Sequence, residues 1–193
     1  MIPMKIINTG IADVKIIEPD LFGDSRGYFF ESWNSAKYAA EGIDCQWIQD
    51  NESCSSYGVL RGLHYQLAPY TQAKLVRVIS GKVLDVAVDI RKNSPTFGQY
   101  AAVELSGENK RQLFIPRGFA HGFAVLSETA VFAYKCDNTY CPAAERGIAF
   151  NDPALGIDWQ IDTARALLSA KDQRHPLLKD AEIFDFNSKE YLQ

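Results

Sequence analysis

The chain has 193 residues, of which 47% are apolar and 23% charged, as in a soluble globular protein and unlike a disordered or membrane-embedded one. Its formal net charge of -4 at pH 7 argues against a general nucleic-acid binder, which needs a basic surface. No apolar run approaches the length of a membrane helix, and the chain length predicts a single domain over residues 1–193.

The amino terminus and the cysteines predict a cytoplasmic protein. Residues 1–5 carry neither a basic leader nor an apolar segment with a cleavage site, so export is not expected. The cysteines Cys45, Cys54, Cys136 and Cys141 show no CxxC spacing. We expect buried or semi-buried free thiols rather than disulfides or a metal cluster.

Short β-rich runs separated by turn residues dominate the chain from about residue 14 to residue 150. The predicted strands are Val14–Glu18, Gly27–Trp33, Trp47–Asn51, Val59–Gln66, Lys74–Ile79, Val83–Asp89, Tyr100–Leu105 and Arg111–Ile115. The turn Ser80-Gly81-Lys82 predicts a hairpin, because Gly favours a tight connection. Such spacing is typical of a β-sandwich or barrel rather than a βαβ protein.

Helical signals flank this β-rich region. A helix is predicted for Ser35–Glu41, with Asn34 or Ser35 as N-cap and Gly42 as terminator. From Asp162 onward, helical and irregular pieces replace strands. The predicted fold is therefore mainly β, a closed or nearly closed barrel with a C-terminal helical cover.

The histidines are the first candidates for proton transfer, because the free pKa of imidazole lies nearest neutrality. His64 lies in the predicted strand Val59–Gln66. Strict alternation places it on the opposite face from Arg61, so both can serve one site only if Gly62 hosts a bulge. From this strand alone, a core histidine satisfied by hydrogen bonds is an equally open interpretation.

The other two histidines differ in setting. His121 follows a turn with Pro116 and Gly118 and stands at the start of a strand, where barrel mouths present side chains to ligands. His175 precedes Pro176 in the tail and is expected on the surface. Because the chain has no HxH pair, a catalytic metal is not expected.

Four further side chains each allow two interpretations. Lys74 is a surface cation or, inside a barrel, a stabiliser of a developing oxyanion. Tyr134 packs in the core beside Phe132 or acts as a general acid. Asp172 caps a helix or accepts the second ring N–H of a histidine. Arg26 pairs with Asp24 in a turn, or joins other cations in a positive field for a diphosphate.

As a set, these motifs resemble the dTDP-4-dehydrorhamnose 3,5-epimerase family from about Ile6 to Leu178. The matching segments are Phe22–Gly27, Gln49–Asn51, Leu60–Gln66, Lys74–Arg77, Val86–Arg91, Ser94–Gly98, Ile115–Phe123 and Leu168–Asp172. Any one of them could arise by chance, but eight in this order specify the family.

The resemblance implies a cupin jelly-roll barrel that works without metal or cofactor. It also implies homodimers in which N-terminal strands contribute to the partner. The implied substrate is a dTDP-linked 4-keto-6-deoxysugar. Inversion of C3 and C5 of dTDP-4-dehydro-6-deoxy-D-glucose would give dTDP-4-dehydro-L-rhamnose, a step of dTDP-rhamnose biosynthesis.

The resemblance also implies roles for individual residues. His64 is the expected general base, oriented by Asp172, with Tyr134 as general acid and Lys74 as stabiliser of the enolate. The expected contacts to nucleotide or sugar are Arg26, Glu31, Gln49, Asp50, Asn51, Arg61, His121, Glu145 and Lys171, with Tyr140 stacking on a ring.

Three alternatives stay open at this point. A relative that inverts only C3 or only C5 would use the same residues. A non-catalytic sugar-binding cupin would have no use for a His-Asp pair opposite a Tyr. A metal-dependent cupin oxygenase is disfavoured by the missing HxH pair.

Overall fold

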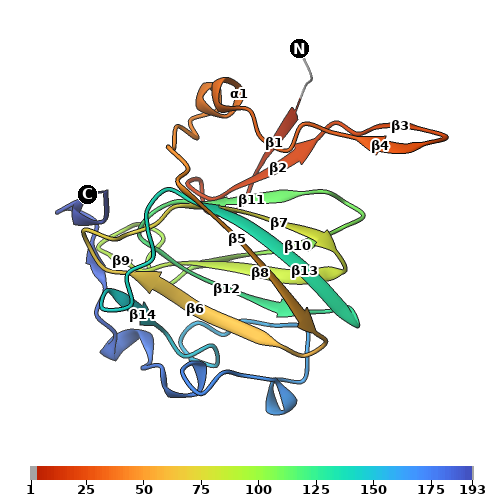
Figure 1. The fold of residues 1–193 in the computed structure, drawn as a ribbon. Helices are drawn as coiled ribbons and strands as arrows, with labels where there is room; N and C mark the ends of the chain where they lie inside the picture. Colours follow the sequence, from red (N-terminus) through yellow and green to blue (C-terminus); the bar gives the residue numbers. More distant parts are fainter. Residues whose placement is uncertain (1–3, 193) are drawn as a thin grey trace.

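Residues 4–192, which the computed structural model describes, form two β-sheets that pack face to face (Figure 1). The six-stranded sheet has the order β1 (Met4–Asn8), β2 (Lys15–Pro19), β11 (Gln112–Ile115), β7 (Lys74–Ser80), β13 (Thr129–Cys136) and β5 (Gln49–Ser56). The five-stranded sheet has the order β10 (Tyr100–Ser106), β8 (Lys82–Asp89), β12 (Phe119–Val125), β6 (Leu60–Gln66) and β14 (Glu145–Gly147). Neighbouring strands pair antiparallel, which confirms the predicted mainly β sandwich.

The core between the sheets forms because apolar side chains alternate inward along facing strands. Phe123 on β12 and Phe132 on β13 stack across the sheets with ring centroids 4.2 Å apart, in one cluster with Val76 of β7. Two residues further along these strands the inward positions are polar, with Lys74 before Val76 and Tyr134 after Phe132. Apolar packing thus fills part of the interior and leaves a polar part for a ligand.

Helix α1 (Ser35–Ala40) forms as predicted. The side chain of Asn34 accepts a hydrogen bond from the backbone N–H of Lys37 at 3.2 Å, as an N-cap does. Gly42 ends the helix with a φ of +77°, which glycine adopts without strain. The helix packs through the buried Tyr38 on the outer face of the six-stranded sheet.

The C-terminal part of the chain covers the outer face of the five-stranded sheet (Figure 1). It contains the 3₁₀ helices η1 (Thr163–Arg165), η2 (Asp172–Arg174), η3 (Leu178–Asp180) and η4 (Glu190–Leu192). Strand β15 (Phe184–Asp185) pairs in parallel with β9 (Arg91–Lys92). The predicted short cover is therefore present, and in the described residues its helices are single 3₁₀ turns. None of the helices in residues 4–192 is long and apolar enough to cross a membrane.

Two local strand predictions are wrong. The turn at Gly81 links β7 of one sheet to β8 of the other, so these strands form no hairpin. An apolar strand looks alike in sequence whether its neighbour is hydrogen-bonded to it or faces it across the core. The predicted strand Gly27–Trp33 ends at Phe29, because β3 (Phe22–Asp24) and β4 (Gly27–Phe29) form a separate projecting hairpin (Figure 1). Trp33 lies beyond this hairpin and packs on Tyr38.

The cysteines mostly follow the prediction. None of the four, all of which lie in the described residues, forms a disulfide. Cys45, Cys136 and Cys141 are buried or half-buried, as expected. Cys54 is exposed, contrary to the prediction, because it occupies an outward position in the alternation of β5.

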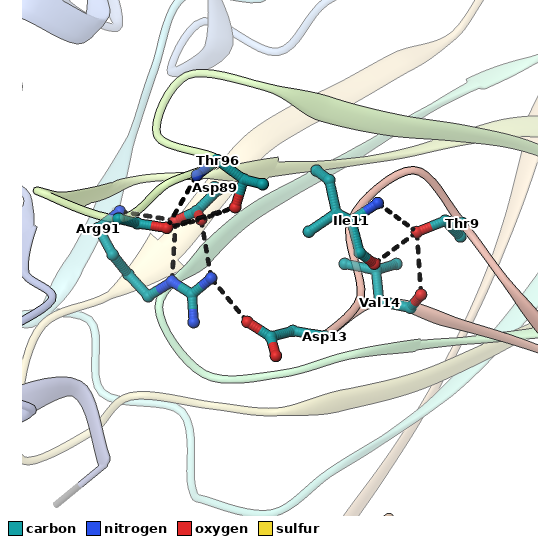
Figure 2. A network of polar contacts seen from close by, with 8 residues as sticks. Thr9, Ile11, Asp13, Val14, Asp89, Arg91 and Thr96 are labelled. Atoms are coloured by element: carbon teal, nitrogen blue, oxygen red, sulfur yellow. Dashed lines mark hydrogen bonds and ion pairs between the residues drawn. The ribbon is translucent and has the colours of Figure 1, made fainter.

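A buried ionic network joins the N-terminal loop to the end of β8 (Figure 2). The guanidinium of Arg91 donates to Asp89 at 2.7 and 2.8 Å and to Asp13 at 2.9 Å. Asp89 also accepts the hydroxyls of Ser94 and Thr96, each at 2.6 Å. Burial alone would raise the pKa of Asp89, but the hydrogen bonds, led by that from Arg91, leave the pKa below its ordinary value.

We expect Asp89→Ala to lower the free energy of unfolding by about 3–5 kcal/mol, because it removes the buried carboxylate from the buried Arg91 and leaves only the more exposed Asp13 as counter-charge. Urea unfolding measures this. Since the folded-state pKa of Asp89 is lowered, its contribution is complete above the unfolded value of about 3.9 and is lost as pH falls through the folded value. Glu18→Ala, which breaks the partly exposed pair with Arg111, is the control and should cost at most about 1 kcal/mol. Equal losses in the two variants would contradict the prediction.

Candidate active site

Two cavities meet inside the sandwich. The larger, of about 720 Å³, is lined by Asn51, Glu52, Ser53, Val59, Leu60, Arg61, His64, Lys74, His121, Phe123, Phe132, Tyr134, Leu167, Leu168, Ser169, Lys171 and Asp172. The smaller, of about 310 Å³, is lined by Gln49, Asn51, His64, Tyr65, Gln66, Gln72, Lys74, Tyr134, Cys136, Tyr140 and Glu145. Four residues line both, namely Asn51, His64, Lys74 and Tyr134. These four mark the centre of the site.

A β-bulge in β6 lets the side chains of His64 and Arg61 line the same cavity. His64 pairs with His121 and Arg61 with Phe123, so two residues of β6 stand opposite one of β12. Gly62 lies in this bulge with a φ of +128°, and a Cβ there would lie 2.5 Å from a backbone Cα of β12. Only glycine fits this position, and the bulge predicted at Gly62 is confirmed.

His64 is held by a buried carboxylate. Its Nε2 lies 2.5 Å from Oδ1 of Asp172, whose other oxygen accepts the hydroxyl of Ser169 at 2.8 Å. Burial alone would raise the pKa of Asp172, but the hydrogen bond with His64 leaves the pKa below its ordinary value, so the carboxylate is ionised. An ionised carboxylate can only accept a hydrogen bond, so Asp172 accepts the Nε2–H of His64. In a neutral His64 ring the lone pair is then on Nδ1. This is the arrangement of an oriented general base.

Lys74 and Tyr134 reach the same cavities from the opposite sheet. Lys74 begins β7 and Tyr134 lies on the neighbouring β13. Burial lowers the pKa of Lys74 and raises the pKa of the Tyr134 phenol. At neutral pH the phenol therefore carries its proton. An imidazole on one sheet thus faces a phenol and an amine on the other.

His121 is also inside the site and has a partner that sequence analysis missed. Its Nε2 lies 2.9 Å from a carboxylate oxygen of Asp85, which is fully buried in β8. Burial lowers the pKa of His121, and Asp85 opposes that shift only in part. The signal that could have revealed Asp85 is a carboxylate at an inward position of the apolar run Val83–Val88.

The rim of the smaller cavity carries an ionic cluster. The carboxylate of Glu145 accepts hydrogen bonds from Nζ of Lys171 at 2.6 Å and from the hydroxyl of Tyr140 at 2.7 Å. Burial alone would raise the pKa of Glu145, but these hydrogen bonds hold it below its ordinary value. Gln49 joins the rim by accepting the backbone N–H of Tyr140 at 3.1 Å. Arg61, in the larger cavity, donates to Ser55 at 3.0 Å.

Three expected contacts lie elsewhere in this chain. Arg26 is on the projecting β3–β4 hairpin, paired with Asp24 at 2.5 Å and exposed. Glu31 accepts a hydrogen bond from the side chain of Asn34 and forms an ion pair with Lys37 near α1. Asp50 points outward from β5, because side chains alternate along a strand and those of Gln49 and Asn51 face inward. It pairs with Lys135 at 3.0 Å.

His175 is not the surface residue predicted from its place in the tail. Its side chain is only 9% exposed, and its Nε2 lies 3.3 Å from Oδ1 of Asp172. Its ring centroid is 5.5 Å from that of His64. The preceding 3₁₀ turn η2 carries both Asp172 and His175 toward β6, which the sequence pattern of the tail did not indicate.

The chain resembles proteins of known activity over nearly its whole length. The sequence profile of dTDP-4-dehydrorhamnose 3,5-epimerase matches residues 8–180. The dTDP-4-dehydrorhamnose 3,5-epimerase of Shigella flexneri is 54% identical over 94% of this chain and 99% of its own.

Solved structures agree. A dTDP-6-deoxy-D-glucose-3,5-epimerase from Legionella pneumophila, crystallised with dTDP-4-keto-L-rhamnose, superposes with a TM-score of 0.92 and 52% identity over 95% of this chain and 99% of its own. A 3'-monoepimerase from Streptomyces bikiniensis, crystallised with dTDP-quinovose, gives a TM-score of 0.88 and 32% identity over 96% and 98% of the two chains. By profile, sequence and fold, the chain belongs to the dTDP-4-dehydrorhamnose 3,5-epimerase family.

Proposed function

We propose that this enzyme inverts C3 and C5 of dTDP-4-dehydro-6-deoxy-D-glucose to give dTDP-4-dehydro-L-rhamnose, with His64, Asp172, Lys74 and Tyr134 performing the chemistry. The observation that carries the catalytic part is that His64 lines the same two cavities as Lys74 and Tyr134, from the opposite sheet. An imidazole and a phenol can therefore flank one bound sugar.

The chemistry requires a base at carbon and a positive charge at oxygen. A C–H bond beside the C4 ketone is acidic because the carbanion delocalises onto the carbonyl oxygen. Nδ1 of His64 removes the proton, Asp172 stabilises the imidazolium that forms, and Lys74 stabilises the enolate oxygen. C3 and C5 both adjoin C4, so the same cation can serve both inversions.

Inversion also requires that the new proton arrive on the opposite face of the sugar. A lone base would return its proton to the face it came from. Tyr134, on the facing sheet and protonated because burial raises its pKa, can supply a proton from the other side.

The remaining cavity residues suit the anionic part of the substrate. Arg61 and Lys171 carry positive charge at the edge of the larger cavity, where a diphosphate needs local cations in a chain of net charge -4. Hydrogen-bonding side chains beside them suit the sugar and the base. We assign to this group Gln49, Asn51, His121, Tyr140 and Glu145.

The experiment that tests this function is turnover in heavy water followed by NMR. We expect deuterium at both C3 and C5 of the product and the L-rhamno configuration. A single-position activity, as in the Streptomyces bikiniensis monoepimerase, would label and invert one carbon only. Binding of the dTDP-sugar without isotope uptake would indicate a non-catalytic module.

Tyr134→Phe is expected to separate exchange from inversion. His64 can still remove and return a proton on one face, so deuterium should enter the recovered substrate while inversion falls by about 10²–10⁴-fold. Tyr140→Phe, on the rim of the smaller cavity, is the control: it should change KM but keep the wild-type ratio of inversion to exchange. Wild-type inversion in Tyr134→Phe would remove Tyr134 from the mechanism.

A homodimer accounts for the residues that lie away from the cavity. The β3–β4 hairpin presents Phe22, Tyr28 and Phe29, whose exposed fractions are 48%, 61% and 62%. Large apolar side chains on a projecting hairpin suit burial against a second copy, and Arg26 would then reach the partner's site. Sedimentation of a monomer at assay concentrations would count against this part of the proposal.

We also assign the enzyme to the cytoplasm. Its four free thiols suit a reducing compartment.

A further inference from the structure

A second histidine lies against the carboxylate that holds His64. Oδ1 of Asp172 is 2.5 Å from Nε2 of His64 and 3.3 Å from Nε2 of His175. The three donor atoms all lie within 4.8 Å of one another. Two imidazole nitrogens and one carboxylate oxygen thus form a close cluster, and the proposed reaction makes no use of His175.

The position of His175 is built into the fold. Its side chain is 9% exposed, and within the described residues its Nε2 makes no hydrogen bond, since its approach to Asp172 lacks the geometry of one. A Cβ on Gly147 would lie 2.4 Å from the ring of His175, so this glycine of β14 makes room for the imidazole. A buried polar atom without a hydrogen bond is uncommon and calls for an explanation.

We propose that His64, Asp172 and His175 form a binding site for a divalent transition metal ion, with zinc as the best match, and that occupation of this site inactivates the enzyme. Two imidazoles and a carboxylate are a ligand set that zinc prefers. The larger cavity, which His64 and Asp172 both line, leaves the fourth position to water.

The distances fit a zinc ion after a small rearrangement of the three side chains. Bonds of about 2.1 Å in a tetrahedron place ligand atoms roughly 3.4 Å apart. The pair Asp172–His175 is already at 3.3 Å, whereas the pair His64–Asp172, at 2.5 Å, must open by about 0.9 Å to reach that spacing. The two imidazole nitrogens, which lie within 4.8 Å of each other, must reach the same spacing.

Nearby charges permit the ion to enter. The carboxylate of Asp172 supplies the negative charge. Lys171 is held by Glu145 at 2.6 Å, so its cation is partly neutralised. The positive charge of Lys74, on the facing sheet, repels the ion. The ion can reach the site through the larger cavity, where the His64 side chain is 29% exposed.

Inactivation follows from the tautomer of His64. A neutral imidazole carries one N–H, which Asp172 now holds on Nε2. Zinc on Nε2 moves that proton to Nδ1, without a net change in protons, and removes the lone pair that attacks the sugar. This consequence rests on the proposed function, whereas zinc binding itself does not.

The first test is zinc binding to chelator-treated protein, measured by competition with a chromophoric zinc indicator. We expect one site in the wild type and in Cys54→Ser, which removes an exposed thiol that could bind zinc elsewhere. His175→Gln and His64→Gln should weaken binding by more than the roughly 10–100-fold that loss of an outer-shell partner costs. Circular dichroism checks that both variants fold. Equal zinc affinity in the wild type and His175→Gln would overturn the site.

The second test is epimerase activity with and without zinc. We expect zinc to lower kcat of the wild type, a chelator to restore it, and His175→Gln to keep its basal activity and resist zinc. Chelation of zinc by the diphosphate of the substrate is common to both proteins and cancels in the comparison. If zinc binds through His175 but leaves kcat unchanged, the inhibitory part is overturned together with the role of His64 as base, while the binding site stands.

Discussion

Replacing His64 with alanine is expected to lower turnover by about 10²–10⁴-fold, the contribution typical of a positioned general base. The loss arises because Nδ1 of His64 is, in the proposed mechanism, the group that removes the proton beside the ketone. Binding of dTDP should survive, since the cations proposed to hold the diphosphate, Arg61 and Lys171, remain. Turnover in heavy water and calorimetric binding of dTDP measure the two effects separately.

The matched control for this variant is His175→Gln. Its side chain also faces Asp172, at 3.3 Å, but takes no part in the proposed chemistry. It should keep near wild-type turnover in metal-free buffer. Loss of isotope uptake in His64→Ala with full uptake in His175→Gln would tie the base function to His64. Wild-type-like activity of His64→Ala would end the assignment.

The local features of the site followed from short-range chemistry. The bulge at Gly62 was predictable because a glycine inside a strand pattern between Arg61 and His64 tolerates backbone conformations that other residues do not. The cap and terminator of α1 were predictable in the same way. Each of these depends on residues close in the chain, where spacing alone decides which side chains meet.

The long-range features could not be predicted from spacing. His64 and Asp172 are 108 residues apart, and only the family resemblance paired them. Asp85 went unnoticed, and His175 was wrongly predicted on the surface, because the importance of both comes from which side chain faces them across two packed elements. The turn at Gly81 shows the same limit, since the choice between a hairpin and a crossing to the other sheet depends on the whole sandwich.

Two of the three expected contacts that lie away from the cavities share one explanation in the proposed homodimer. Resemblance transfers residues to a site without saying which subunit supplies them. Arg26 and Glu31 lie on the N-terminal arm, away from both cavities. If a partner's arm completes the site, the two residues contribute in trans, and a single chain contains an incomplete set of contacts.

Lys74→Met is the second substitution with a large expected effect, a fall in kcat of about 10²–10³-fold, as for loss of one oxyanion contact. Methionine keeps the length of the side chain and removes the charge, so the substrate should still bind. Lys171→Met is the matched control: its cation is proposed to meet the diphosphate rather than the reacting oxygen, so KM should rise more than kcat falls.

The pH dependence gives Lys74 a signature that a structural role would not produce. Burial lowers the pKa of Lys74, while the charges of Cys136, Asp85 and Glu145 oppose that shift. Since the enolate needs the protonated amine, the rate should fall as pH rises through a pKa below the ordinary lysine value of about 10.4. The residual activity of Lys74→Met should lack this alkaline limb, because the remaining acid, Tyr134, has a raised pKa. An unchanged alkaline limb in Lys74→Met would assign it to another group and leave the enolate without its proposed cation.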